Sequence, residues 1–338
     1  MSSSATLPEP ISRSKVVQKA RINWKSEDYA GFGRTQQRLP HDYHTLPLFQ
    51  QSALISLLDS YPRQWLQAFT MGTDPCRRQD WQPVDIPADA SGQDIWSAVE
   101  GGRYWLNIIF ITEVSADFAD LITGMYQHLG EHCPHLAGPR ADYSALLISS
   151  PGTQLYYHLD ASPNMLWNLR GTERFWLYPA MDTRFAPQAF LEDIYAGEID
   201  EEMPYHPDFD QSATCYTLQP GEVASWPHNA PHRVEYIDLS VSLATSYHTP
   251  LLERRRRVQL ANRYILRELG IQHRSMQETG LRSAAKRLVF RAVNKMRPFK
   301  KAKDPLSTYI TDLQLDPSAP GGMRKLANAI PASFSSMN

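Results

Sequence analysis

Hydrophobic and polar positions follow helical spacing in the first part of the chain. From Leu48 to Phe69 the apolar residues recur every three to four positions, and Pro62 interrupts the run, which predicts two helices beside a core. A loop rich in Pro and Asp follows over 71–92. The apolar run of 102–111 then predicts a buried strand, and 115–133 predicts a helix with Ser115 as its N-cap.

The pattern changes to short strands after residue 140. Aromatic and β-branched residues gather in short runs, and Gly, Pro and Asp separate one run from the next. This spacing predicts a sandwich or barrel, so the fold class is mainly β with flanking helices (α+β). The predicted strands are 144–150, 154–160, 164–171, 172–179, 213–221, 222–227, 232–237 and 239–247.

Helical spacing returns at Leu251 and continues to about Arg297. We therefore divide the chain into an N-terminal region whose helices pack on the core (1–140), a β domain (141–250), a basic helical segment (251–300) and an extended C-terminal tail (301–338).

Composition narrows the class of protein. The chain has 338 residues, of which 42% are hydrophobic, so it can bury a sizeable core. Its longest apolar run, near 106–111, is much shorter than the roughly 20 residues of a membrane helix, and the polar start lacks a signal-peptide pattern. Cys76, Cys133 and Cys215 lie far apart and indicate reduced thiols. We expect a soluble, cytoplasmic protein with no membrane association.

The formal net charge of -2 conceals a strong asymmetry. Residues 251–303 contain sixteen Lys and Arg against three Glu, which leaves the remainder of the chain acidic. Such a segment could bind nucleic acid, an acidic partner or a membrane surface. Val258, Ala261, Ile265 and Leu269 recur at helical steps, however, so we favour a packed helix whose arginines face water or the acidic remainder. The helix is also a candidate element for a homodimer.

Candidate chemistry begins with the stretch YYHLD. In a strand, residues two apart project from one face, so His158 and Asp160 could offer a nitrogen and an oxygen to one metal ion while Leu159 faces away. His206 and Asp208 repeat the spacing, but Pro207 lies between them, and we interpret that pair as loop.

A third ligand is available in the stretch PGEVASWPHNAPHRVEY. His228 is expected at the apex of a loop, whereas His232 enters a strand, which is the more rigid position, so we favour His232. Two imidazoles and one carboxylate with open coordination positions form the facial triad of non-haem ferrous oxygenases. This set suits Fe(II) better than structural zinc, which prefers four protein ligands and usually sulfur.

The ordered combination of these motifs resembles a known family. The run 156–179, followed by 218–236 and 239–244, is similar to JmjC-type and related cupin-like proteins of the Fe(II)- and 2-oxoglutarate-dependent oxygenase superfamily. The resemblance covers about 144–247. It implies a double-stranded β-helix (cupin or jelly-roll) core that binds iron through His158, Asp160 and His232, with Asn164 near the cosubstrate.

One position departs from that family. Relatives commonly carry a G-x-K motif whose lysine pairs with the distal carboxylate of 2-oxoglutarate, but here Glu173 takes the place of the lysine after Gly171. A carboxylate would repel the cosubstrate. Arg174, if a bulge shifts the strand, and Arg170, if its strand is regular, are the alternative anchors, because a guanidinium can bind a carboxylate through two hydrogen bonds. Either arginine could equally be an ion-paired surface residue.

The aromatic residues near the ligands could line a pocket or simply fill the barrel; they are Tyr156, Tyr157, Trp167, Trp176 and Trp226. The resemblance implies a dioxygenase that hydroxylates a small-molecule or protein substrate, with Fe(II) and 2-oxoglutarate as cofactor and cosubstrate. Two alternatives stay open. One is a cupin-like metal-binding protein without 2-oxoglutarate turnover, which Glu173 favours, and the other is an interaction module whose basic C-terminal segment binds a polyanion.

Overall fold

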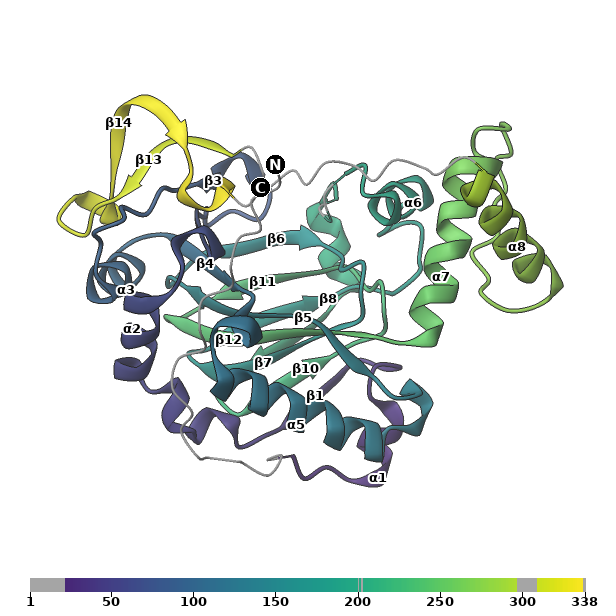
Figure 1. The fold of residues 1–338 in the computed structure, drawn as a ribbon, viewed down its shortest axis with the longest axis horizontal. Helices are drawn as coiled ribbons and strands as arrows, with labels where there is room; N and C mark the ends of the chain where they lie inside the picture. The colour runs from purple at the N-terminus through teal and green to yellow at the C-terminus, as the bar shows by residue number, and fades with distance from the viewer. Residues whose placement is uncertain (1–21, 200, 202, 297–308, 337–338) are drawn as a thin grey trace.

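The computed structural model describes residues 22–199, 201, 203–296 and 309–336. Two antiparallel sheets stand face to face at the centre, with helices on the outer side of each (Figure 1). No helix in these ranges combines the length and hydropathy that crossing a bilayer requires.

The larger sheet has eight strands in the order β1-β10-β7-β12-β5-β4-β2-β3. Its central strands come from the predicted β domain, and strands from the N-terminal region extend it at both edges. Their bounds are β1 Gln37–Pro40, β2 Leu66–Thr70, β3 Gln82–Pro83, β4 Tyr104–Ile109, β5 Arg140–Ser149, β7 Asn164–Arg170, β10 Glu222–Ser225 and β12 Ser240–His248.

The smaller sheet has four strands in the order β6-β11-β8-β9. These are β6 Gln154–His158, β8 Glu173–Leu177, β9 Thr214–Leu218 and β11 His232–Tyr236. From β5 to β12 the chain passes repeatedly between the two sheets, with β5, β7, β10 and β12 in the larger and the rest in the smaller. This winding is a double-stranded β-helix, so the mainly β core with flanking helices is confirmed.

Gly171 makes the turn that carries the chain from β7 in one sheet to β8 in the other. Its φ is +77°, and a Cβ at this position would collide with the backbone oxygen of Leu239. Only glycine adopts this conformation without strain in so little space.

The N-terminal region supplies helices as well as edge strands. The helices are α1 Ser26–Gly31, α2 Gln51–Ser60, α3 Gly92–Gly101, α4 Ile111–Val114 and α5 Ala116–His132. The expectation of a second helix after Pro62 is wrong, because Leu66–Thr70 forms β2 and pairs with β4. Ser115 does occupy the N-cap of α5, but its side chain makes no capping hydrogen bond within the described chain.

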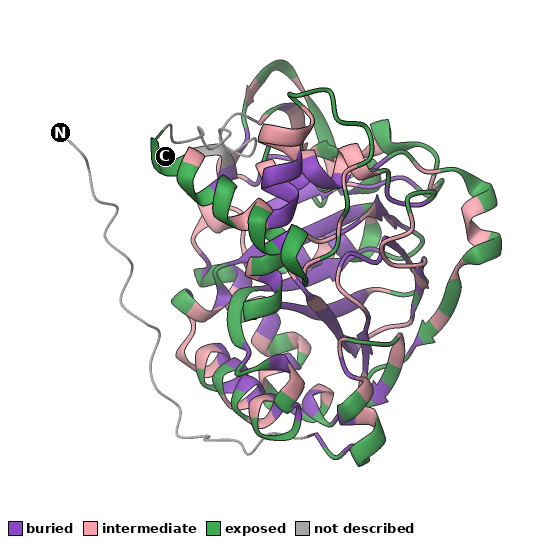
Figure 2. Ribbon diagram, turned by 90° about the vertical axis from the view of Figure 1, so that its right-hand side faces the viewer, coloured by how far each residue is buried: buried purple, intermediate pink, exposed green. Residues whose placement is uncertain are grey.

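Buried side chains form three clusters that alternate with the sheets. Figure 2 shows that the buried residues concentrate along the strands in the interior of the molecule. The first lies between the N-terminal helices and the larger sheet, where Trp167 is fully buried. The second fills the space between the two sheets and includes Phe175 and Trp226. The third covers the outer face of the smaller sheet and includes Tyr157 and Leu159. The apolar face of each layer is thereby removed from water, which is the main stabilising term of the fold.

Helix α6 (Gln188–Ala196) shares the third cluster with the smaller sheet, α7 (Pro250–Ala261) packs against α6, and α8 (Leu281–Met296) packs against α7. A π-helical turn, Asn262–Leu266, continues α7. The expected extended tail is partly a hairpin of β13 (Ile310–Leu315) and β14 (Met323–Pro331), which reaches back to the N-terminal region through a bridge between Asp85 and Gln314. Residues 301–308, 337 and 338 of the predicted tail lie outside the described residues.

Candidate metal centre

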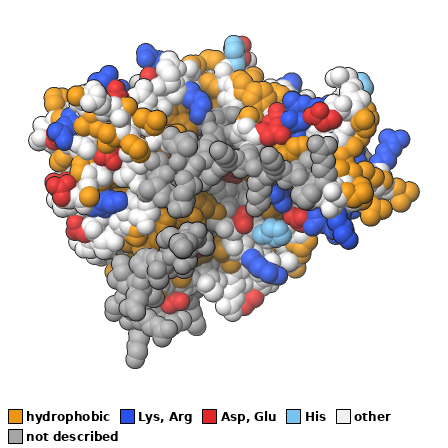
Figure 3. All heavy atoms as spheres, turned by 45° about the horizontal axis from the view of Figure 1, so that its top comes forward, with side chains coloured by type: hydrophobic (Ala, Val, Ile, Leu, Met, Phe, Trp, Pro, Cys, Tyr) orange, Lys and Arg blue, Asp and Glu red, His pale blue; other side chains and the backbone are white. Residues whose placement is uncertain are grey.

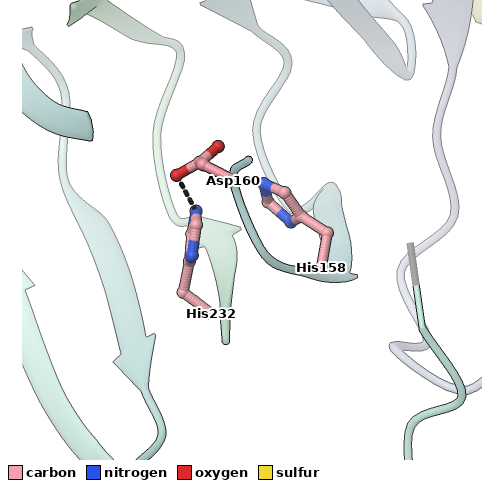
Figure 4. Close-up of side chains that lie close together, drawn as sticks. All are labelled: His158, Asp160 and His232. Atoms are coloured by element: carbon pink, nitrogen blue, oxygen red, sulfur yellow. Dashed lines mark ion pairs between the residues drawn. The ribbon is translucent and has the colours of Figure 1, made fainter. Parts of the chain in front are cut away.

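His158 and His232 meet at one end of the smaller sheet. His158 is the last residue of β6, His232 is the first residue of β11, and the two are direct partners across the strand pair. Their ring centroids are 4.2 Å apart. The strand pairing alone therefore brings together two imidazoles that are 74 positions apart in the sequence (Figure 4).

Asp160 completes the group from the loop that follows β6. The strand ends at His158, so Asp160 lies just beyond it instead of within it as expected, while Leu159 turns to the opposite side and is buried. One Asp160 oxygen, Oδ2, lies 3.6 Å from His232 Nε2. The candidate ligand atoms of His158, Asp160 and His232 all lie within 4.8 Å of one another.

Backbone carbonyls fix both imidazole rings. His158 Nδ1 lies 2.7 Å from the oxygen of Tyr156, and His232 Nδ1 lies 3.2 Å from the oxygen of Ala230. Placing the proton on Nδ1 leaves Nε2 with a free lone pair in each ring, which is the form that binds a metal. Burial lowers the pKa of both histidines to about 4, so both rings are neutral near pH 7.

Asp160 carries a buried oxygen that needs a partner. Its carboxylate receives a hydrogen bond from the Asn164 side chain, and its backbone oxygen accepts one from Asn229 Nδ2 at 3.1 Å. Burial raises the pKa of the carboxyl group, and Oδ2 has no hydrogen-bond partner among the described residues. A divalent cation would satisfy this oxygen and both Nε2 atoms, so the three residues fit a metal ion.

The three ligands face a cavity of about 540 Å³ between the two sheets. Phe175 and Trp226 pack against the ring of His232 with centroid distances of 5.3 and 4.9 Å. Tyr156 and Asn164 also line this cavity, and Tyr156 accepts a hydrogen bond from Gly72 N at 3.0 Å. The three candidate metal ligands thus share one partly enclosed space with apolar walls, an arrangement typical of a small-molecule site.

The larger sheet contributes a polar wall that the sequence did not reveal. The Tyr143 hydroxyl donates to Asn107 Oδ1 at 3.2 Å, and Asn107 Nδ2 donates to Gln67 Oε1 at 2.8 Å. Gln67 is buried and lines the cavity, yet its Nε2 has no partner in the described chain. A signal was present in the single polar residue of each apolar stretch, Gln67 in 65–69 and Asn107 in 105–109, but the helical spacing of 48–69 hid the first.

Neither arginine proposed as a cosubstrate anchor lies in the cavity, and this expectation is corrected. Arg170 lies over the ring of Trp96 and donates to Gln51 at 3.1 Å, on the helix-covered side of the larger sheet. The pairing of β7 with β12 shifts register beside Arg170, so its strand is not regular there. Arg174 follows normal strand alternation to the outer face and pairs with Glu235 at 3.2 Å.

Glu173, the second residue after Gly171, is completely buried between the sheets. Its Oε1 accepts hydrogen bonds from the hydroxyl groups of Ser240 and of Ser242, the second at 2.6 Å, while Oε2 has no partner among the described residues. Burial without a neighbouring cation raises the pKa of this carboxyl group. No Lys or Arg is among the described residues that line the cavity.

The remaining candidates lie elsewhere. His228 Nε2 bonds Ala161 O at 2.9 Å and Tyr195 OH at 3.1 Å, and it is not part of the metal group. His206 and Asp208 lie in an exposed 3-10 turn, Pro207–Ser212, in agreement with the loop interpretation. Of the aromatic residues, Tyr156 and Trp226 line the cavity, whereas Tyr157, Trp167 and Trp176 belong to the packing outside it.

Comparisons with known proteins give structural similarity only. No family model matches the chain, and no curated protein matches its sequence. A solved structure of Escherichia coli ycfD is similar with a TM-score of 0.49 and 13% identity, covering 83% of this chain and 70% of that one.

Two further structures of the same Escherichia coli protein, a ribosomal oxygenase, each have a TM-score of 0.48 and cover 83% of this chain and 69% of theirs. They are 14% and 13% identical to it, and the second is a complex with cobalt and 2-oxoglutarate.

Proposed function

We propose that this protein is an Fe(II)- and 2-oxoglutarate-dependent oxygenase. His158, Asp160 and His232 would hold the iron, and Asn164 would orient the carboxylate ligand. The single observation that supports this most is the convergence of two neutral imidazoles and one buried carboxylate on an enclosed cavity. Such a metal centre uses O2 and 2-oxoglutarate to hydroxylate a C–H bond, and it releases succinate and CO2.

The cavity supports a neutral anchor for the cosubstrate in place of the lysine. The distal carboxylate of 2-oxoglutarate would find no described Lys or Arg in the walls, so hydrogen-bond donors must replace the cation. Gln67 Nε2 is a buried donor without a described partner, and the chain of hydrogen bonds through Asn107 and Tyr143 fixes its orientation. We assign Gln67 as the anchoring donor and Tyr156 as a wall of the same pocket, and we no longer assign Arg170 or Arg174.

Calorimetric titration under anaerobic conditions tests the proposal in two steps. Mn(II) is added first as a redox-stable substitute for Fe(II), and 2-oxoglutarate is then added to the metal-loaded protein. We expect both to bind, and we expect Gln67→Leu to weaken only the second step by about tenfold, because a buried donor is removed. Succinate formation under air with Fe(II), absent in Asp160→Ala, would complete the assignment.

The lack of a Lys or Arg among the described residues of the cavity walls also favours a second candidate, a cupin-like metalloprotein that does not use 2-oxoglutarate. Glu173 would repel a dianion if it were ionised. Binding of Mn(II) without any heat from 2-oxoglutarate, in the wild type at pH 6 and at pH 8, would establish this candidate and exclude the first.

The proposal extends to substrate and compartment. The substrate is a small molecule or a protein side chain, and the ribosomal oxygenase activity of the similar Escherichia coli protein is the reason to test protein substrates first. We place the protein in the cytoplasm, because Cys76, Cys133 and Cys215 are free thiols. A homodimer through the C-terminal helices and binding of nucleic acid stay predictions.

A further inference from the structure

Helix α8 exposes large apolar side chains at one extremity of the molecule. Leu281 is 90% exposed, Leu288 68% and Met296 78%. Figure 3 shows hydrophobic side chains beside Lys and Arg at the end of the molecule where Figure 1 places α8. Exposed apolar groups scattered singly need no explanation, but these belong to one helix and call for a partner.

The exposed residues form a continuous stripe. Positions 281, 285, 288, 292 and 296 are Leu, Ala, Leu, Ala and Met, and steps of three and four residues place them on one face of a helix. The opposite face holds α8 to the protein. Ser283 and Phe290 are buried there, and Lys286 donates to Asn262 Oδ1 at 2.8 Å. The helix is therefore fixed along its inner side, and the stripe stays available along about 24 Å of its outer side.

Positive charge borders the stripe. Arg282 lies on one side, and Arg291 and Lys295 lie on the other, and none of the three forms an ion pair with another described residue. The sequence contains nine Lys and Arg and no Asp or Glu between Leu281 and Lys303. The charge is net positive along the whole helix.

Most arginines of the neighbouring region behave differently. Arg255 pairs with Glu278, Arg263 with Asp193 at 2.8 Å, and Arg274 with Glu192 at 2.8 Å. Much of the positive charge of the basic segment is therefore neutralised by ion pairs within the fold, in agreement with the packed-helix interpretation. The uncompensated charge concentrates on α8.

We propose that the outer face of α8 binds the surface of a bilayer that contains anionic phospholipids. The apolar stripe would enter the boundary between head groups and acyl chains, and Arg282, Arg291 and Lys295 would contact lipid phosphates. This association lies along the membrane surface and does not span the bilayer, so the proposal replaces the expectation of no membrane association, and no described helix needs to cross a membrane.

The geometry favours a bilayer over other partners. A nucleic acid would use the cations but leave the exposed leucines in water. A second copy would bring two helices of the same strong positive charge together. A groove on a protein partner would need to surround α8, whose inner half is already covered by its own chain. A flat anionic surface satisfies both the charge and the stripe.

Vesicle sedimentation with the full chain tests this proposal. One set of vesicles is pure phosphatidylcholine, and the other contains phosphatidylcholine and phosphatidylglycerol in equal parts. We expect sedimentation only with the anionic vesicles and a decrease as salt is added, because screening weakens the lipid contacts. The double variant Leu288→Ser/Met296→Ser should bind about tenfold more weakly, since it removes buried apolar surface.

A matched control is Leu269→Ser, which removes a leucine that is 71% exposed but lies outside α8. It should bind like the wild type, and unchanged thermal unfolding of all variants would confirm that they fold. The proposal is overturned if the wild type does not sediment with anionic vesicles, if it binds both vesicle types equally, or if the double variant binds as well as Leu269→Ser. A Leu288-dependent dimer in light scattering, without vesicle binding, would assign the stripe to a second copy.

Discussion

Two regions of this protein carry the same short motif in different surroundings. His158 and Asp160 end a strand and face a cavity, where His232 from the adjacent strand joins them. His206 and Asp208 have the same spacing but belong to a 3-10 turn, where the two side chains are 64% and 75% exposed. His206 Nδ1 lies 3.4 Å from the Asp208 carboxylate and accepts a hydrogen bond from the backbone N–H of Asp208 at 3.2 Å.

The difference shows that the H-x-D spacing supplies two possible metal donors but does not by itself create a metal site. A metal ligand set needs a third donor, removal from bulk water, and rings whose orientation is fixed by other contacts. The first pair receives all three from β6 and β11, because antiparallel pairing places His232 opposite His158. The second pair has neither a third donor among the described residues nor removal from water, since Pro207 prevents its segment from pairing as an inner strand.

The largest expected effect is on the affinity for Mn(II), and it distinguishes the two H-x-D pairs directly. Asp160→Ala should lower the affinity for Mn(II) by more than about 100-fold, because it removes the one anionic ligand. Asp208→Ala is the matched control and should leave the affinity unchanged. Anaerobic calorimetry measures both, and equal affinities of the two variants would show that the metal does not bind at the first pair.

The second effect concerns Asp210, which lies in the same turn as Asp208 but has a structural role. It accepts a hydrogen bond from the buried Arg233 at 2.6 Å, and the Arg233 guanidinium stacks on Trp176 at 4.1 Å. Asp210→Ala should lower the free energy of unfolding by about 3 kcal/mol, because a buried cation loses its carboxylate. Urea denaturation should show this loss and almost none for Asp208→Ala. Similar losses for both would disprove the role of Asp210.

The third effect distinguishes the two histidines of the loop before β11. His228→Ala should weaken Mn(II) binding by about tenfold, because its ring holds Ala161, the residue after Asp160, without touching the metal. His232→Ala should weaken it far more, as the loss of a ligand. If the two variants lose the same affinity, His228 has been placed in the wrong role.

The smallest effect tests the buried carboxyl group in the inner barrel. The pKa of Glu173 is higher in the folded protein than its ordinary value of 4.5. The protonated carboxyl group therefore stabilises the fold below pH 4.5, and this stabilisation is lost as the pH rises from 4.5 through the folded pKa. Glu173→Gln keeps an oxygen for Ser240 and Ser242 but cannot ionise. The free energy of unfolding of this variant should therefore exceed that of the wild type by about 1 kcal/mol at pH 8, with little difference at pH 4.

Urea melts across this pH range provide the measurement. Glu235→Gln is the control, because Glu235 pairs with Arg174 on the outer face of the same sheet. A pH dependence in the Glu173→Gln variant equal to that of the wild type would show that Glu173 ionises freely in the folded protein.

The strands of the barrel could be read from the sequence because their patterns are local. Runs such as 164–171 and 239–247 alternate side chains between two faces and end at Gly or Pro, and each became a strand. The run 66–70 gave the wrong prediction, since a short apolar stretch fits helix and strand equally well. It became β2 because β4 offers a hydrogen-bonding edge from 38 positions further along the chain.

The expectation that Arg170 or Arg174 would face the cavity failed for a related reason. A register shift between β7 and β12 turned Arg170 towards Trp96, and no local pattern announces such a shift. Gln67 entered the cavity wall only because β2 was added to the larger sheet.

By itself, the sequence determined which residues were able to bind a metal and which segments were strands, because both follow from side-chain chemistry and from a two-residue repeat. The tertiary structure decided which H-x-D pair lies beside a third candidate ligand and which residues of the larger sheet form the opposite wall of the cavity. It also decided which Lys and Arg side chains form no ion pair with a described Asp or Glu. Those outcomes depend on the register and order of strands distant in sequence, and these are set by burial and pairing across the whole barrel.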